Sequence, residues 1–246
     1  MRRVEQIMGT AISLDIADPL PDDVVTGLAD DVFAWMREVD ERFSTYKETS
    51  EISRIAAGTL TAAEASADVT DVLAACADLW RETDGYFDIQ AAGGLDPSGY
   101  VKGWAVQVAS DRLLAAGSAN HCVNAGGDVR VRGHPRPGAP WRVGVRHPFD
   151  PASVCFVLAG TDLAVATSGT YERGPHVVDP RRGVPAVGLR SVTVTGPDLG
   201  RADAYATAAV AMGEAGIGWL AALDGYESAV VTDDGRSYRS DLLPQA

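Results

Sequence analysis

The feature of this sequence that most constrains its fold is the separation of helical and strand-like hydrophobic patterns. Apolar residues recur every three or four positions in residues 25–43, 69–82 and 101–116, which predicts three amphipathic helices. A fourth helix is predicted to begin near Asp203. Between the third and fourth helices the pattern favours strands, over residues 121–132, 141–146, 154–158, 162–166 and 191–195.

Because these blocks do not alternate as repeated βαβ units, the order favours an α+β fold with antiparallel sheet over a doubly wound parallel sheet. Two further strands are predicted at residues 11–16 and 227–232. The second is followed by Asp-Asp-Gly, which favours a hairpin with residues 237–239. The sequence has no internal repeat and no long linker, so we expect a single domain over residues 1–246.

Charge limits the partners that this protein can have. Its 246 residues include 21 basic and 34 acidic side chains, a net charge of −13. An acidic surface repels nucleic acid, so a phosphate-bearing ligand would need a metal ion or a few local basic groups. The sequence offers neither a stretch of about 18 apolar residues nor an apolar segment after Arg2 and Arg3. We therefore expect no membrane span and a cytoplasmic location.

Several common motifs are missing from the sequence. It contains no G-x-x-x-x-G-K-[ST] loop, no H-E-x-x-H pair and no strand–G-x-G-x-x-G–helix unit. The three cysteines, Cys76, Cys122 and Cys155, are odd in number and widely spaced. That spacing argues against a disulfide framework and a structural zinc site, and it predicts small buried side chains.

Polar or glycine-rich clusters remain, embedded in apolar sequence. They are Met8-Gly9-Thr10 and residues 43–53, 83–88, 96–105, 123–128, 166–173, 176–180 and 203–208. In this order, from about residue 8 to about residue 232, they resemble the ApbE family of FAD:protein FMN transferases. The resemblance implies an α+β fold of two intertwined lobes, with FAD and Mg²⁺ bound between them. It also implies cleavage of the FAD pyrophosphate, transfer of FMN to a Thr or Ser hydroxyl of an acceptor flavoprotein, and release of AMP.

Asp203 and Thr207 are the candidate metal ligands. They stand four residues apart on a predicted helix, so both oxygens project from one face. Magnesium prefers hard oxygen ligands and takes few protein carboxylates. From the residues alone, the simpler interpretation is that Asp203 is a helix cap and Thr207 a buried helix residue. The resemblance implies that both bind Mg²⁺ with the Gly99 carbonyl, and that Asp203 is catalytic.

The resemblance also implies a set of FAD contacts. They are Met8, Thr45, Tyr46, Tyr86, Phe87, Asp88, Lys102, Thr167, Ser168 and Val177. Lys102 is predicted in the first turn of its helix, where a helix N-terminus and neighbouring glycines favour an anion. The ring of Tyr46 follows a predicted helix end and can stack on a base. The residues alone also allow a solvated lysine, a core tyrosine, a core phenylalanine at Phe87, and a turn at residues 167–168.

His176 is the candidate general base. Its position matches a histidine of the family, and its ordinary pKa near 6.5 suits proton abstraction from an incoming hydroxyl. The chain departs from the family pattern in a shorter segment between Phe87 and Lys102, and in Ala56 and Thr170, where Asn and Asp are common. These departures keep the metal pair but leave the details of flavin contact open.

Three functions other than FMN transfer compete with it. One is Mg²⁺-dependent hydrolysis of FAD to FMN and AMP, and another is non-catalytic flavin binding. The third is a metal-free hydrolase built on Ser168, His176 and Asp179. The sequence lacks the G-x-S-x-G motif that would place the nucleophilic serine of such a hydrolase on a sharp turn.

Overall fold

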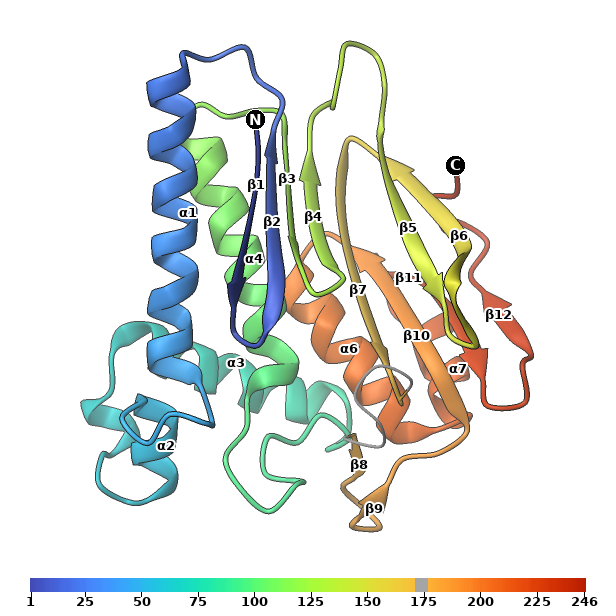
Figure 1. Ribbon diagram of the computed structural model, residues 1–246. Helices are drawn as coiled ribbons and strands as arrows, with labels where there is room; N and C mark the ends of the chain where they lie inside the picture. The colour runs from blue at the N-terminus through green and yellow to red at the C-terminus, as the bar shows by residue number, and fades with distance from the viewer. Residues whose placement is uncertain (171–176) are drawn as a thin grey trace.

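An eight-stranded antiparallel sheet organises the computed structural model, which describes residues 1–170 and 177–246. The strand order is β1-β2-β3-β4-β7-β10-β11-β12 (Figure 1). The bounds are Arg2–Ile7, Thr10–Ile16, His121–Ala125, Asp128–Arg132, Asp162–Gly169, Leu189–Gly196, Glu227–Thr232 and Ser237–Arg239. The sheet therefore joins residues from both ends of the chain, and it confirms the expected α+β fold.

Helices cover one face of this sheet (Figure 1). Helices α1 (Asp22–Phe43), α4 (Ser98–Ala115) and α6 (Leu199–Met212) contact its strands. The smaller helices are α2 (Glu51–Ala56), α3 (Ala67–Glu82), α7 (Ala215–Ala221) and a 3₁₀ turn at Ala62–Glu64. The larger core lies between these helices and the sheet, and burial of its apolar side chains is what holds the two layers together.

A two-stranded sheet covers part of the opposite face. It consists of β5 (Trp141–His147) and β6 (Asp150–Gly160), which pair antiparallel. A second, smaller core lies beneath it and includes Val131, Val145 and Leu158. The remaining short pair is β8 (Val178–Asp179) with β9 (Val184–Pro185). Strand β7 thus runs between two apolar layers, with Leu163 and Val165 in the smaller core and Ala164 and Ala166 in the larger one.

Four sequence-based expectations need correction. The fourth helix begins at Leu199, because Asp198 caps it by accepting from Arg201 N at 2.7 Å, so Asp203 lies inside the helix. The third helix begins at Ser98, so Lys102 is in its second turn. The strand expected at 162–166 runs to Gly169 and takes in residues 167–168. The segment 121–132 is two strands, because two successive glycines at residues 126–127 adopt positive φ, 58° and 103°, and turn the chain.

Trp80 and the cysteines differ in their burial. Trp80 lies in the helix predicted at residues 69–82, where the apolar pattern favours an inward side chain, but it is 50% exposed and packs beside the backbone of Gly85. Burial raises the pKa of the Cys76 and Cys122 thiols to about 12, and none of the three cysteines forms a disulfide, as the spacing indicated.

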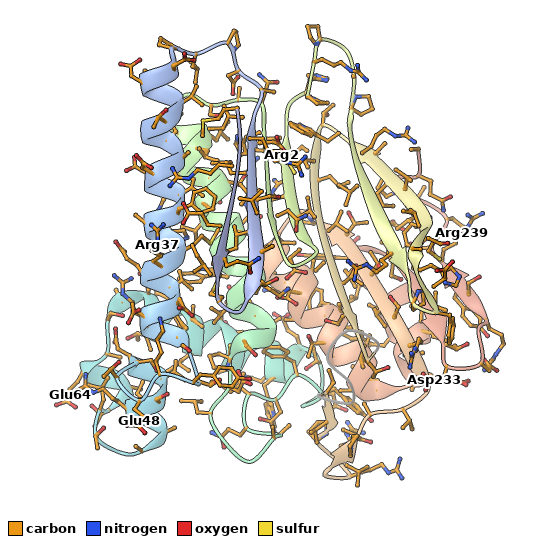
Figure 2. All side chains as sticks on the ribbon, in the orientation of Figure 1. Arg2, Arg37, Glu48, Glu64, Asp233 and Arg239 are labelled. Atoms are coloured by element: carbon orange, nitrogen blue, oxygen red, sulfur yellow. The ribbon has the colours of Figure 1, made fainter. Side chains whose placement is uncertain are left out.

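Acidic side chains such as Glu48 and Glu64 project outward around α2 (Figure 2). In the described part of the chain, no helix is both long and apolar enough to cross a bilayer.

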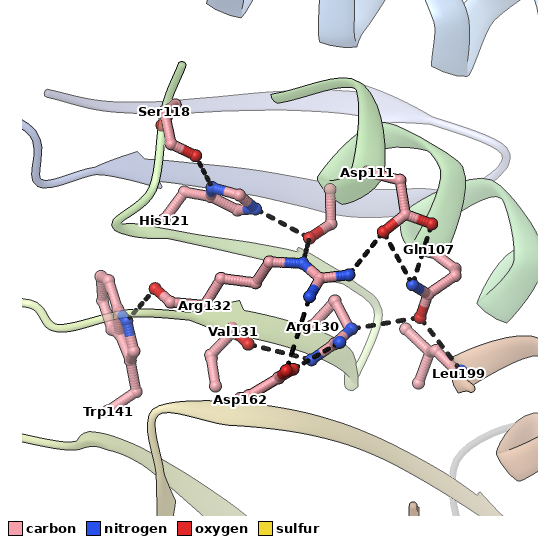
Figure 3. Close-up of polar contacts among 11 residues, drawn as sticks. Gln107, Asp111, Ser118, His121, Arg130, Val131, Arg132, Trp141, Asp162 and Leu199 are labelled. Carbon is pink, nitrogen blue, oxygen red and sulfur yellow. Dashed lines mark hydrogen bonds and ion pairs between the residues drawn. The ribbon is translucent and has the colours of Figure 1, made fainter. Parts of the chain in front are cut away.

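A buried polar network ties α4 to the sheet (Figure 3). Gln107 Oε1 accepts from Arg130 Nε at 3.1 Å and from the Leu199 backbone N–H at 3.3 Å. Deeper in the network, His121 bonds Ser110 Oγ at 2.7 Å and the Ser118 carbonyl at 2.9 Å. One glutamine of α4 therefore fixes both a sheet arginine and the first turn of α6. The network sets how the two helices that carry Gly99 and Asp203 lie against each other.

Candidate active site

One cavity of about 350 Å³ gathers the candidate residues. It lies between the segment that follows α1, the start of α4, strand β7 and helix α6. Every candidate that the structure describes lines it: Met8, Thr45, Tyr46, Tyr86, Phe87, Asp88, Gly99, Lys102, Thr167, Ser168, Val177, Asp203 and Thr207. His176 lies outside the described residues. The cavity is thus built from distant parts of the sequence, which agrees with a site between two lobes.

Local backbone conformation delivers Met8 and Tyr46 to the cavity. Met8 and Gly9 form the two-residue turn between β1 and β2, with positive φ of 54° and 68°. Tyr46 follows the end of α1, and its side chain is 97% exposed while it lines the cavity. A fully exposed aromatic ring is poorly hydrated and packs against no other side chain. The face of the Tyr46 ring is therefore available to a planar ligand.

The loop after α3 presents Tyr86 and Phe87. Thr83 is fully buried, and its Oγ1 donates to the Leu79 carbonyl at 2.7 Å and accepts from Phe87 N at 2.9 Å. This link fixes the loop, and Phe87 is only 3% exposed, so it serves both core and cavity wall. The Arg181 guanidinium lies 4.3 Å from the centre of the Tyr86 ring and so covers one ring face.

Helices α4 and α6 meet closely at Asp203. Its carboxylate is 3% exposed, and Oδ2 accepts from Gly103 N at 3.1 Å. In an uninterrupted helix that N–H bonds to the carbonyl four residues earlier, that of Gly99. The same N–H also donates to Asp203, and the Gly99 carbonyl, with two lone pairs, keeps acceptor capacity for another partner. A Cβ at Gly103 would lie 2.5 Å from the Leu199 carbonyl oxygen, so glycine permits this approach.

Hydroxyl oxygen atoms meet one turn further along α6. Thr207 Oγ1 lies 3.1 Å from Ser168 Oγ on β7, and a Cβ at Gly99 would lie 3.2 Å from Thr207 Oγ1. Among the described residues, no group of three His, Cys, Asp or Glu side chains could hold a metal ion. One carboxylate, hydroxyls and a backbone carbonyl are the set that remains, and that set fits Mg²⁺, which completes its shell with water and phosphate.

The hydroxyls of Thr167 and Ser168, which are neighbours on β7, lie on opposite faces of the sheet. Ser168 Oγ faces Thr207 on α6, whereas Thr167 Oγ1 bonds Thr193 Oγ1 of β10 at 2.9 Å. Strand alternation requires this division. Thr167 therefore lines the cavity while its hydroxyl already has a partner, and Ser168 carries the hydroxyl that faces the oxygen cluster.

Lys102 is the basic side chain at this end of the cavity. Its Nζ pairs with Asp128 Oδ2 and lies 3.6 Å from Asp203 Oδ2. Asp128 is fully buried at the start of β4 and was missed as a site residue. Its signal in the sequence is an acid directly after two glycines inside an apolar strand pattern, a position where a solvated turn is the ordinary interpretation.

The family model described as "ApbE family" matches residues 8–95 and 90–230. The chain belongs to the ApbE family. This match confirms the resemblance on which the site residues were selected, and together the matched ranges extend over most of the described chain.

Individual relatives agree with the family assignment. The chain is 38% identical over 130 residues to an FAD:protein FMN transferase of Vibrio cholerae, covering 49% of this chain and 39% of that protein. It is 38% identical over 150 residues to one of Rhodobacter capsulatus, covering 57% of this chain and 28% of that protein. These matches span less than half the length of each relative.

Among solved structures, the flavin transferase ApbE from Vibrio cholerae superposes with a TM-score of 0.82 and 26% identity. That superposition covers 98% of this chain and 97% of the other. The ApbE fold is therefore shared over nearly the whole chain.

Proposed function

We propose that this member of the ApbE family is a Mg²⁺-dependent transferase that moves FMN from FAD to a Thr or Ser hydroxyl of an acceptor flavoprotein. The acceptor oxygen forms a phosphoester bond to the FMN phosphorus, the bond between that phosphorus and the AMP oxygen breaks, and AMP leaves. The hydroxyl proton passes to a base of the protein. We also propose that residues 1–246 act as one domain, since Met8 and Thr207 line the same cavity.

The observation that carries this proposal is the convergence of hard oxygens at one end of the cavity. Asp203 and Thr207 of α6 lie one helical turn apart, and Ser168 Oγ is 3.1 Å from Thr207 Oγ1. With the Gly99 carbonyl, Asp203 and Thr207 would hold the Mg²⁺. The bound ion would neutralise charge on the pyrophosphate as a Lewis acid. In a chain with a net charge of −13, local cations are needed for such a substrate.

The protein's own groups mainly bind and orient the substrate. The exposed ring of Tyr46 and the covered ring of Tyr86 are placed to contact planar rings, with Met8, Thr45, Phe87, Asp88 and Val177 around them. Lys102 supplies a positive charge near the oxygen cluster. His176 stays our candidate for the base because of its place in the family pattern.

Mass spectrometry of an acceptor flavoprotein tests the proposal. The purified protein is incubated with FAD, Mg²⁺ and a candidate acceptor, beside an acceptor whose target Thr or Ser is replaced by Ala. We expect a mass gain of one FMN on the intact acceptor, none on the Ala variant, and none after EDTA. Free FMN and AMP without modified acceptor would instead identify an FAD pyrophosphatase. Unchanged FAD would identify a flavin-binding protein.

A further inference from the structure

Three charged side chains form a cluster at the cavity wall, where Lys102 and Asp203 line the cavity. Lys102 of α4 lies between Asp128 of β4 and Asp203 of α6. Both carboxylates are buried, with residue exposures of 0% and 3%. The lysine Nζ is in direct contact with Asp128 Oδ2 but 3.6 Å from Asp203 Oδ2. The ammonium group is therefore shared unequally between two buried carboxylates, and Asp128 holds it.

The fold fixes Asp128 from two sides. It is the first residue of β4 and pairs with Ala125 across the two-glycine turn. Its Oδ1 lies 3.4 Å from the backbone N–H of Thr167 on the neighbouring strand, which donates to it. With Oδ1 directed at β7, Oδ2 faces Lys102. A carboxylate anchored in this way by the sheet acts as a fixed attachment point for a long, flexible side chain from α4.

From this geometry we propose that Asp128 is a positioning residue. It keeps the Lys102 ammonium beyond hydrogen-bond distance of Asp203, so that the Asp203 carboxylate can bind the divalent cation. The inference rests on the proposed function in one respect, that Asp203 is a metal ligand. An ammonium and a divalent cation compete for the same carboxylate, and in a buried site each charge interaction is strong. Among the described residues, Asp203 is the other carboxylate beside Lys102, 3.6 Å from Nζ, so without a charge at Asp128 the two would pair and oppose metal binding.

Metal binding measured without FAD tests this inference. Mn²⁺, a hard-cation probe, is titrated into the full chain while electron paramagnetic resonance counts the free ion. Asp128→Asn should lower the affinity by roughly ten- to a hundred-fold, the usual effect of losing a residue that supports a metal ligand. Lys102→Met combined with Asp128→Asn removes the competing ammonium and should restore the affinity to within a few-fold of the wild type. Thermal unfolding identifies any variant that fails to fold.

A matched control and a structural readout separate positioning from simple loss of charge. Asp15→Asn removes a carboxylate from β2 of the same sheet, where it pairs with Arg2 at 3.7 Å, and should leave Mn²⁺ affinity unchanged. In a crystal structure of Asp128→Asn, Lys102 Nζ should move from 3.6 Å to a hydrogen-bond distance of about 2.8 Å from Asp203 Oδ2. If Nζ does not move, any lost affinity comes from the missing charge alone, and the proposal is wrong.

The other outcomes are also decisive. Unchanged Mn²⁺ affinity in Asp128→Asn, or no recovery in the folded double variant, would overturn the role of Asp128 while leaving the metal site in place. Asp203→Asn is measured alongside to distinguish this from failure of the proposed function. If Asp203→Asn binds Mn²⁺ as tightly as the wild type, Asp203 is not a ligand, and both proposals fall together.

Discussion

Thr207 Oγ1 of helix α6 lies 3.1 Å from Ser168 Oγ of strand β7, which joins two hydroxyls 39 residues apart in the sequence. The Gly99 backbone at the start of α4 approaches the same threonine. A helix and a strand thus supply hydroxyl oxygens to one point of the cavity, beside the first turn of a second helix. This convergence makes Thr207 the most direct place to test the metal site.

Thr207→Val removes the hydroxyl and keeps nearly the same shape. We expect the Mg²⁺ concentration needed for half-maximal FMN transfer to rise by roughly ten-fold or more, because an oxygen ligand is lost. Thr207→Ser keeps the hydroxyl and should behave like the wild type. The measurement is transfer rate against Mg²⁺ concentration. Identical curves for Val and Ser would show that Thr207 Oγ1 is not a ligand.

Tyr46→Ala separates ligand binding from stability. The side chain is 97% exposed, so its removal should leave the midpoint of thermal unfolding unchanged. Stacking of an aromatic ring on a base contributes about 1–3 kcal/mol, so FAD affinity should fall by roughly ten-fold, as followed by quenching of flavin fluorescence. Leu242→Ala, at another exposed apolar side chain, is the control and should alter neither quantity. Undiminished FAD affinity in Tyr46→Ala would remove Tyr46 from the site.

His176→Ala tests the candidate base. Proton abstraction matters only in the transition state, so transfer should slow by about 10²–10⁴-fold while FAD affinity changes little. His134→Ala is the control, since that ring bonds the Ala139 carbonyl outside the residues that line the cavity. Rates come from single-turnover experiments and affinities from titration. A parallel loss of affinity would make His176 a flavin contact, and an unchanged rate would assign the base to another group.

His121 predicts a pH dependence of stability. Burial lowers the pKa of its ring below the ordinary 6.5, because the fully buried ring would lose its hydration in the charged form; the hydrogen bond with the Ser118 carbonyl acts in the opposite direction and is outweighed. The unfolded chain then binds the proton more readily than the folded chain. The histidine's stabilising contribution is therefore complete above about pH 6.5 and is lost as pH falls below it.

The free energy of unfolding, measured with urea at about pH 7.5 and about pH 5.5, checks this sign. The wild type should lose more stability between the two pH values than His121→Gln, which has no titrating ring. The same loss in both proteins would assign the pH dependence to other groups.

Gly103→Ala tests the close contact of α4 with α6. The added Cβ would lie 2.5 Å from the Leu199 carbonyl oxygen and 2.9 Å from Asp203 Cβ, so the helices must separate. We expect a destabilisation of about 1–3 kcal/mol from overpacking, together with weaker Mg²⁺ binding. Gly27→Ala on the exposed face of α1 meets nothing within 4 Å and should stabilise by up to about 1 kcal/mol. Equal unfolding free energies for the two variants would contradict the close packing.

Local pattern predicted the parts of the site that lie within one element. The four-residue spacing of Asp203 and Thr207 placed both on one face of a helix, and both line the cavity on α6. The start of that helix was predicted four residues late, because the cap at Asp198 resembles an ordinary loop aspartate in the sequence. The extent of β7 was also missed, since Thr-Ser-Gly suits a turn as well as it suits a strand.

What the sequence by itself determined is the class of fold, because hydrophobic periodicity is a local property of the chain, while the kinds of residue at the site came from its resemblance to the ApbE family. What only the tertiary structure decided is which of these residues meet. The contact of Lys102 with Asp128, and that of Ser168 with Thr207, depend on how α4 and α6 pack against the sheet. Such contacts join residues far apart in sequence. Which residues meet is decided by the packing of the whole core, and no single segment of the sequence specifies that packing.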